Sequence, residues 1–327
     1  MANPLFCAPI QVWEYQKCEI MSIYLPIAEI SINIYLLLSI GGAVGFLSGM
    51  FGLGGGFLMT PLLIFMGIPT NVAVATSANQ IVASSISGTM GHWRQGLVDF
   101  KMGSVLLFGG FFGSIFGVWI FHKLVLIGQI ETVISILYFI LLVSIGTLML
   151  IESSQVIRDR IRKTTVKKKI HYHNWAHRLP FKVRFYKSKL YISVIPPIII
   201  GFLIGILSAT MGIGGAFILI PAMIYFLGMP TSKVIGTSLF QIIFITALVT
   251  ILHATTTFAV DAVLAFFLIL SSVIGAQFGV IAANKLRGEE IRALLAVIVL
   301  TVAVKIALDL LLIPDDVFNI SVTRTLF

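Results

Sequence analysis

Long apolar stretches, separated by short polar or glycine-containing breaks, occupy most of the chain. Most of them approach the ~20 residues that an α-helix needs to cross the hydrocarbon core of a membrane. This pattern predicts an all-α polytopic membrane protein. The predicted helical segments cover residues 32–50, 56–67, 71–92, 102–121 and 130–151, and then 192–209, 216–227, 231–253, 262–283 and 291–313.

Two of these stretches, 56–67 and 216–227, are shorter than the rest. About 12 residues extend roughly 18 Å as an α-helix, which predicts half-helices or strongly tilted helices. Each contains a proline, Pro61 or Pro221, which a membrane tolerates where neighbouring groups satisfy the freed backbone carbonyls. The pattern leaves open whether these segments cross the bilayer or re-enter it.

A glycine-rich motif precedes each short stretch. GFLSGMFGLGGGFLMTP covers Gly45 to Pro61, and GILSATMGIGGAFILIP covers Gly205 to Pro221, 160 positions later. The similarity continues through the next two stretches after single-residue insertions. We therefore predict two homologous membrane repeats of about five helical segments each, with the second segment short and preceded by a glycine-rich break.

Composition agrees with a membrane protein. Hydrophobic residues make up 58% of the chain and charged residues 11%, and the mean hydropathy is +1.05; soluble domains carry about 25% charged residues. The predicted divisions are an N-terminal segment (1–31), repeat 1 (32–151), a basic loop (152–190), repeat 2 (191–313) and a C-terminal tail (314–327). Residues 1–20 lack the apolar core of a signal peptide, and Met21 is an alternative start.

Positive charge is concentrated in one place. Of the 22 Lys and Arg residues, 12 lie between Arg158 and Lys189, which predicts a cytoplasmic loop beside anionic lipid rather than a nucleic-acid partner. If all ten segments cross the membrane, 18 of the 22 fall on the cytoplasmic side. Four crossings per repeat would instead put Lys285, Arg287 and Arg292 outside. Five crossings are therefore favoured, and an odd number inverts repeat 2 relative to repeat 1.

The glycine-rich breaks are candidate anion sites. The first N–H groups of a helix lack internal partners and carry partial positive charge, so the starts at Gly54 to Phe57 and Gly214 to Phe217 could bind an anion without a buried cation. The alternative is close helix packing, which we expect for the glycines at four-residue spacing. Those packing glycines are Gly41, Gly45 and Gly49; Gly109, Gly113 and Gly117; Gly201 and Gly205; and Gly275 and Gly279.

The stretches 71–92 and 231–253 have unusually polar interiors. Gln80 and Gln241 fall about halfway along them, near the bilayer midplane, and Thr76 and Thr237 lie one turn earlier on the same face. An amide at that depth can donate to an oxyanion. The alternative role is interhelical hydrogen bonding, worth about 0.6–2 kcal/mol in membranes. Thr70 and Thr231 are predicted N-caps of these helices.

Other ionisable residues are weaker candidates. His92 and His253 occupy equivalent helix ends, where we expect solvated caps, with proton coupling as the alternative. Lys305 and Asp309 are spaced i, i+4, which predicts a structural ion pair, with a proton relay as the alternative. His171, His173 and His177 lack accompanying carboxylates or cysteines, so no metal site is predicted. No catalytic motif is present, and we predict neither an enzyme nor a cofactor.

The doubled motif resembles the sulfite exporter TauE/SafE family of membrane permeases. The resemblance rests on GFLSGMFGLGGGFLMTPLLIFMGIPTNVAVATSANQIVASSISG and the weaker GFLIGILSATMGIGGAFILIPAMIYFLGMPTSKVIGTSLFQ, and covers roughly residues 38–313. It implies transport of sulfite, sulfonates or related anions across the bacterial inner membrane, often as export. Ala216 replaces the third glycine and Phe240 lies opposite Asn79, so the second repeat offers fewer polar groups.

Together, the residues and the resemblance predict a secondary transporter of a small sulfur-containing oxyanion. Its expected partners are that anion and the lipid bilayer. The alternatives are a permease for another small anion and a non-transporting scaffold acting through the basic loop; a cation transporter is disfavoured because no unpaired acidic residue lies in mid-membrane. The predicted substrate-binding residues are Ser48, Gly52, Gly54, Gly55, Gly56, Thr76, Asn79, Gln80, Ser208, Gly212, Gly214, Gly215, Thr237 and Gln241.

Overall fold

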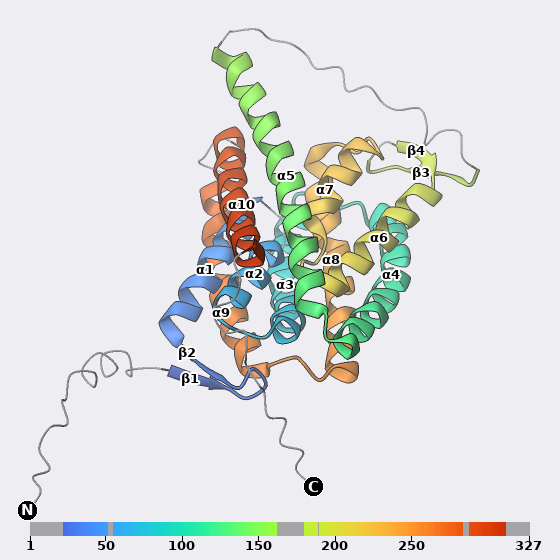
Figure 1. Ribbon diagram of the computed structural model, residues 1–327. Coiled ribbons are helices and arrows are strands. Elements are labelled where there is room, and N and C mark those ends of the chain that lie inside the picture. Colours follow the sequence, from blue (N-terminus) through green and yellow to red (C-terminus); the bar gives the residue numbers. More distant parts are fainter. Residues whose placement is uncertain (1–21, 52–54, 162–179, 189, 284–287, 312–327) are drawn as a thin grey trace, which may run out of the picture. The chain divides into compact units, whose positions relative to one another are not determined.

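A computed structural model describes residues 22–51, 55–161, 180–188, 190–283 and 288–311 (Figure 1). Several predictions lie outside these residues. They concern Gly52 and Gly54, the three loop histidines, the extreme N-terminal segment, the C-terminal tail and much of the basic loop. The remaining predictions can be compared with the structure directly.

The described residues are mostly helical, which confirms the all-α polytopic class. Six helices are long and apolar enough to cross a membrane, and three shorter apolar helices accompany them. The elements are β1 (Ser22–Leu25), β2 (Ile30–Asn33), α1 (Ile34–Phe51), α2 (Gly56–Phe65), α3 (Thr70–Arg94), α4 (Phe100–Ile127) and α5 (Ile130–Ile161), then β3 (Lys182–Phe185), β4 (Leu190–Ser193), α6 (Ile195–Met211), α7 (Ala216–Tyr225), α8 (Thr231–Thr256), α9 (Ala262–Ala283) and α10 (Gly288–Leu311).

The element order of the first half recurs in the second half. Each half has an antiparallel hairpin followed by a first helix, a 10-residue second helix and three longer helices. The hairpins were not expected. They begin in the segments described above as the N-terminal segment and the basic loop, and their second strands extend beyond these segments, to Asn33 and Ser193. The hairpins start 160 positions apart, at Ser22 and Lys182. The repeat therefore begins earlier than the glycine motif indicates.

The chain divides into two compact units. Residues 1–126 and 170–285 form unit 1, which holds both hairpins and helices α1–α4 and α6–α9. Residues 127–169 and 286–327 form unit 2, in which α5 packs against α10. Within unit 1, the β1–β2 and β3–β4 hairpins lie at opposite ends (Figure 1).

The first helix of each half packs closely against the fourth helix of the other half. A Cβ at Gly45 of α1 would overlap backbone atoms of Ser272 in α9, and a Cβ at Gly113 of α4 would overlap backbone atoms of Phe202 in α6. The other glycines predicted to serve packing also lie against backbone atoms of the facing helix, except Gly41, which lies against the Ser271 side chain. The packing prediction is confirmed, and the two halves exchange their first helices in unit 1.

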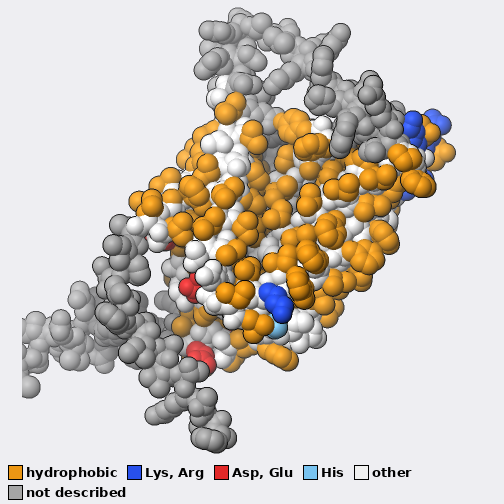
Figure 2. All heavy atoms as spheres, turned by 45° about the vertical axis from the view of Figure 1, so that its right-hand side comes forward, with side chains coloured by type: hydrophobic (Ala, Val, Ile, Leu, Met, Phe, Trp, Pro, Cys, Tyr) orange, Lys and Arg blue, Asp and Glu red, His pale blue; other side chains and the backbone are white. Residues whose placement is uncertain are grey.

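The outer face of α4 shows why these helices suit a membrane. While its glycines approach α6, the side chains of Phe108, Phe112 and Phe116 are 58%, 51% and 45% exposed. Hydrophobic side chains cover most of the molecular face in Figure 2. Such a surface is stable in lipid, where apolar side chains need no burial against protein.

Candidate functional site

The two short helices each begin at a glycine in the left-handed region. Gly55, with φ 76°, precedes α2, and Gly215, with φ 78°, precedes α7. A glycine adopts this conformation without the steric cost that a Cβ brings. Neither helix start has a side-chain cap, so its first N–H groups point out of the helix without an intrahelical acceptor.

An aromatic stack joins these two helix starts. The rings of Phe57 in α2 and Phe217 in α7 are parallel, with centroids 4.4 Å apart and an interplanar angle of 3°. Both side chains are buried. The two phenylalanines are equivalent in the repeats, so the structure brings together the corresponding breaks that the sequence predicts to meet.

Helix α3 supports the breaks of both halves. The Ser77 hydroxyl lies 3.0 Å from the Val74 carbonyl of its own helix and 3.3 Å from the Gly212 carbonyl of the second half, and it can donate to either. It also lies 2.7 Å from the Thr60 hydroxyl in α2. The Ile81 side chain is so close to Gly56 and Gly214 that a Cβ at either position would clash with it. Glycine is therefore required here for close approach to α3, in addition to any role in binding.

Gln80, next to Ile81 in α3, has a side-chain amide without a partner in the part of the chain that the structure describes. The side chain is fully buried, and neither Oε1 nor Nε2 has a hydrogen-bond partner within the described part of the chain. A buried polar group left unpaired costs about 1–3 kcal/mol. The prediction that Gln80 binds a polar ligand is compatible with this environment and stays a prediction.

Its counterpart Gln241 in α8 is only partly engaged. Gln241 Nε2 donates to the carbonyl of Leu106 at a long 3.4 Å, while Oε1 has no partner among the described residues.

The buried Ser208 hydroxyl is also without a partner among the described residues. Its equivalent, Ser48, lies against Gly55, where an added Cβ would be 3.0 Å from the Ser48 Cβ. Of the remaining candidates, Asn79 is half-buried.

Thr76 and Thr237 form hydrogen bonds that link the halves. The Thr76 hydroxyl accepts from the backbone N–H of Asp261 at 3.1 Å, and the Thr237 hydroxyl accepts from that of Asp99 at 3.0 Å. Thr237 also donates to the carbonyl of Lys233 at 2.7 Å. These bonds give both threonines a structural role, and their part in substrate binding remains a prediction.

Asp99 and Asp261 are buried carboxylates that the sequence reasoning did not select. Asp261 accepts from the N–H groups of Val263 and Leu264 at the start of α9 and of Ile27 at the turn of the β1–β2 hairpin, each at 3.0 Å. Asp99 at the start of α4 accepts from Met102 N–H at 3.2 Å and from the β3–β4 hairpin. The sequence signal was available, because the two residues match across the repeats and each precedes an apolar helix.

The Asp99 contact with the second hairpin is made by one residue. The Ser188 N–H and hydroxyl both donate to Asp99 Oδ2, at 3.0 and 2.6 Å. Each hairpin is thus tied to an aspartate of the other half. Backbone N–H groups donate to both aspartates, and the Ser188 hydroxyl donates to Asp99 as well.

The four weaker candidates for proton coupling lie in different surroundings. His253 is buried, with Nε2 2.9 Å from the Ala209 carbonyl and its ring 4.6 Å from that of Phe121. His92 is half-buried, and its Nδ1 has no partner in the described residues. Lys305 and Asp309 are exposed on α10 in unit 2. Burial of His253 contradicts the solvated-cap expectation for that residue. Proton coupling stays a prediction.

One local prediction is wrong. Thr70 and Thr231 are the first residues of α3 and α8, and the N-cap positions belong to Pro69 and Pro230, which have no side chain able to cap. The extended backbone of the two prolines, with ψ 136° and 130°, provides the N-cap conformation one residue earlier.

These features define a class, a polytopic helical membrane protein built from two halves of the same element order around a pair of glycine-rich helix breaks. The chain belongs to the sulfite exporter TauE/SafE family, whose model matches residues 37–306. No match to a solved structure was found.

Curated relatives agree with membrane transport. The chain is 27% identical over 279 residues to a probable membrane transporter protein, YjnA, of Bacillus subtilis, covering 84% of this chain and 99% of the relative. A probable membrane transporter protein of Xylella fastidiosa is 28% identical over 275 residues, covering 81% of this chain and 91% of that protein. A shorter similarity, 32% over 81 residues, covers 25% of this chain and 18% of the sulfite exporter TauE/SafE family protein 5 of Arabidopsis thaliana.

Proposed function

We propose that this protein is a secondary transporter that exports sulfite or a related sulfur-containing oxyanion across the bacterial inner membrane. The observation that carries the proposal is the Gln80 amide, which is buried and has no hydrogen-bond partner among the described residues. Gln80 lies in the helix whose Ile81 side chain packs against Gly56 and Gly214 of the two glycine-rich breaks. Backbone N–H groups at helix starts and an amide Nε2 are donors suited to an oxyanion. The choice of a sulfur-containing anion as the substrate rests on the description of the family as a sulfite exporter.

The proposed mechanism is alternating access. The two halves act as inverted repeats, and rocking of one against the other exposes the anion first to one side of the membrane and then to the other. Inversion is supported by the charge distribution and by the opposite ends at which the two hairpins lie (Figure 1). In this arrangement the basic loop faces the cytoplasm.

The binding donors are divided between the halves. Gln80 and the N–H groups at the start of α2 come from the first half, while Ser208, Gln241 and the start of α7 come from the second. An anion held by both sets would lose donors from one half as the halves separate. Whether the anion is bound would then depend on the position of one half relative to the other.

The test is sulfite efflux from proteoliposomes loaded with the anion. We expect Gln80→Leu to weaken apparent sulfite affinity by about tenfold to a hundredfold, because a hydrogen bond to a charged ligand contributes about 1.5–3 kcal/mol. Thr246→Val is the matched control. It also removes a buried polar group from a long helix, but the Thr246 hydroxyl donates to the Ile242 carbonyl of its own helix at 2.8 Å.

Two results would count against the proposal. Unchanged sulfite efflux in folded Gln80→Leu would remove Gln80 from the site. An absence of efflux of sulfite, thiosulfate, sulfate and sulfonates by the folded wild-type protein would remove the transport assignment itself and favour the scaffold alternative.

A further inference from the structure

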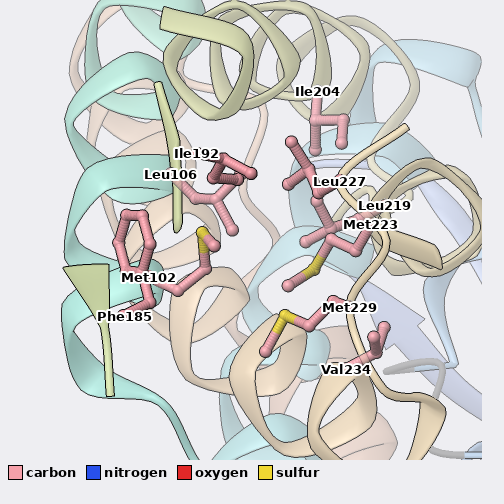
Figure 3. Packing of buried hydrophobic residues seen from close by; sticks show 10 residues of the cluster. All are labelled: Met102, Leu106, Phe185, Ile192, Ile204, Leu219, Met223, Leu227, Met229 and Val234. Carbon is pink, nitrogen blue, oxygen red and sulfur yellow. The ribbon is translucent and has the colours of Figure 1, made fainter. Parts of the chain in front are cut away.

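The β3–β4 hairpin has one buried face and one exposed face. Phe185 and Ile192 are buried in a hydrophobic cluster with side chains of α4, α6 and α7 (Figure 3). On the other face, Lys182, Arg184 and Tyr191 are exposed, and Arg184 pairs with Tyr191 across the two strands. The cluster therefore holds the hairpin in place while its charged and aromatic face remains accessible.

Basic and aromatic side chains gather on this hairpin. The Arg184 guanidinium lies 5.5 Å from the centre of the Tyr186 ring, and Lys187 Nζ lies 5.2 Å from that of Phe100. Lys187 also donates to the Val98 carbonyl at 3.3 Å, and Lys101 Nζ to the Arg184 carbonyl at 3.1 Å. These contacts of Arg184, Lys187 and Lys101 are with carbonyl oxygens and aromatic rings. None of these contacts is with a carboxylate, so they do not neutralise the positive charge. Figure 2 shows Lys and Arg side chains at this end of the molecule.

A hollow of about 650 Å³ lies on the hairpin. It is lined by Arg184 and by the hydrophobic or aromatic side chains of Phe185, Tyr186, Leu190 and Tyr191. Its volume is in the range of about 300–1,000 Å³ seen for small-ligand sites. A guanidinium beside tyrosines and apolar side chains suits a ligand with a phosphate group and an adjoining hydrocarbon part.

The equivalent hairpin of the first half has none of this charge. Arg184 corresponds to Tyr24, and Lys187 corresponds to Ile27. The backbone arrangement recurs in both hairpins, so the fold alone does not require the cations. The charge difference between two equivalent elements points to a ligand specific to the second hairpin.

We propose that the β3–β4 hairpin binds the headgroup phosphate of an anionic membrane phospholipid, with Arg184 as the principal phosphate ligand. The hairpin leads directly into the apolar helix α6, so it lies where a membrane helix meets the headgroup region. Tyrosines are enriched at that depth, and basic side chains there attract anionic lipid. The bound lipid anchors this end of unit 1 to one leaflet.

The test compares lipid binding to the purified full-length protein by native mass spectrometry, with phosphatidylglycerol and phosphatidylcholine as probes. We expect the wild type to prefer phosphatidylglycerol, and Arg184→Tyr, which installs the residue of the first hairpin, to weaken that binding about fivefold, as expected for one basic residue near a membrane surface. Lys123→Tyr removes an exposed cation from α4 and serves as the charge-matched control. It should bind phosphatidylglycerol like the wild type.

Thermal unfolding with each lipid gives a second measurement on the same samples. Phosphatidylglycerol should raise the melting temperature of the wild type and Lys123→Tyr more than that of Arg184→Tyr. Equal binding by Arg184→Tyr and the wild type would overturn the proposal. Equal stabilisation by inorganic phosphate without lipid would also overturn it, because the site would then recognise a free anion. The lipid measurement is independent of sulfite transport, so either proposal can fail without the other.

Discussion

At the scale of single residues, two threonine–aspartate contacts join the halves of the chain. Thr76 accepts from the N–H of Asp261, and Thr237 accepts from the N–H of Asp99. Each aspartate then binds the hairpin of the half to which the threonine belongs. The Thr76 hydroxyl, one turn from Gln80, thus bonds the residue that directly precedes helix α9 of the other half.

Removing one of these hydroxyls should therefore lower stability. In Thr76→Val the buried N–H of Asp261 loses its acceptor, and we expect the free energy of unfolding to fall by about 1–3 kcal/mol. Thr76→Ser keeps the hydroxyl and should lose much less. Denaturation in detergent, followed by circular dichroism, measures both variants. Equal stability of Thr76→Val and the wild type would show that the hydrogen bond contributes nothing to folding.

At the scale of elements, glycine has two separate uses in this protein. Along α1, α4, α6 and α9 it allows helix backbones to touch, as at Gly45 against Ser272. At Gly55 and Gly215 it allows a left-handed conformation just before a short helix. The first use depends on the neighbouring helix, and the second depends on the local backbone.

The packing use predicts a clear contrast between two substitutions. Gly45→Ala would place a Cβ against the Ser272 backbone and should destabilise the protein by about 1–3 kcal/mol through overpacking. Gly91→Ala, in α3, is the matched control, because a Cβ there meets nothing within 4 Å. Since alanine favours helix over glycine, this control should be neutral or stabilising. Thermal melting of both variants in detergent is the measurement, and similar melting temperatures would contradict the packing role.

At the scale of the whole molecule, the two halves in sequence are not independent in space. Helix α1 packs on α9, and α6 packs on α4, so each half lacks its packing partner when it is alone. The two compact units also cross the repeat boundary, because α5 and α10 come from different halves and form unit 2 together. We therefore expect folding of either half to require the other.

This interlocking predicts how a divided chain behaves. Residues 1–169 and 170–327, expressed as separate polypeptides in the same cell, should co-purify and unfold as one complex. Either polypeptide expressed alone should be degraded or aggregate, because the close-packed glycine faces would lack their partners. Size-exclusion chromatography of affinity-tagged fragments distinguishes the outcomes. A monodisperse, helical single half would contradict the exchange of first helices.

The sequence by itself determined the class, the repeat and the helices, because hydropathy and glycine spacing are local properties. Long apolar stretches must form helices in lipid, where every backbone polar group needs a partner. Glycines four residues apart identified the packing faces before their partners were known. The two short helices after the glycine breaks were predicted from the length of their apolar stretches, which is also a local property.

Only the tertiary structure decided which groups meet. The Thr76–Asp261 hydrogen bond joins residues 185 positions apart, and no local pattern encodes its partner. The four-residue hairpin strands were too short for a clear alternation pattern. Whether a buried polar group is paired depends on its neighbours in space. Thr76 and Gln80 are polar residues of one helix face, yet the Thr76 hydroxyl accepts a hydrogen bond from Asp261 N–H, while the Gln80 amide has no partner among the described residues.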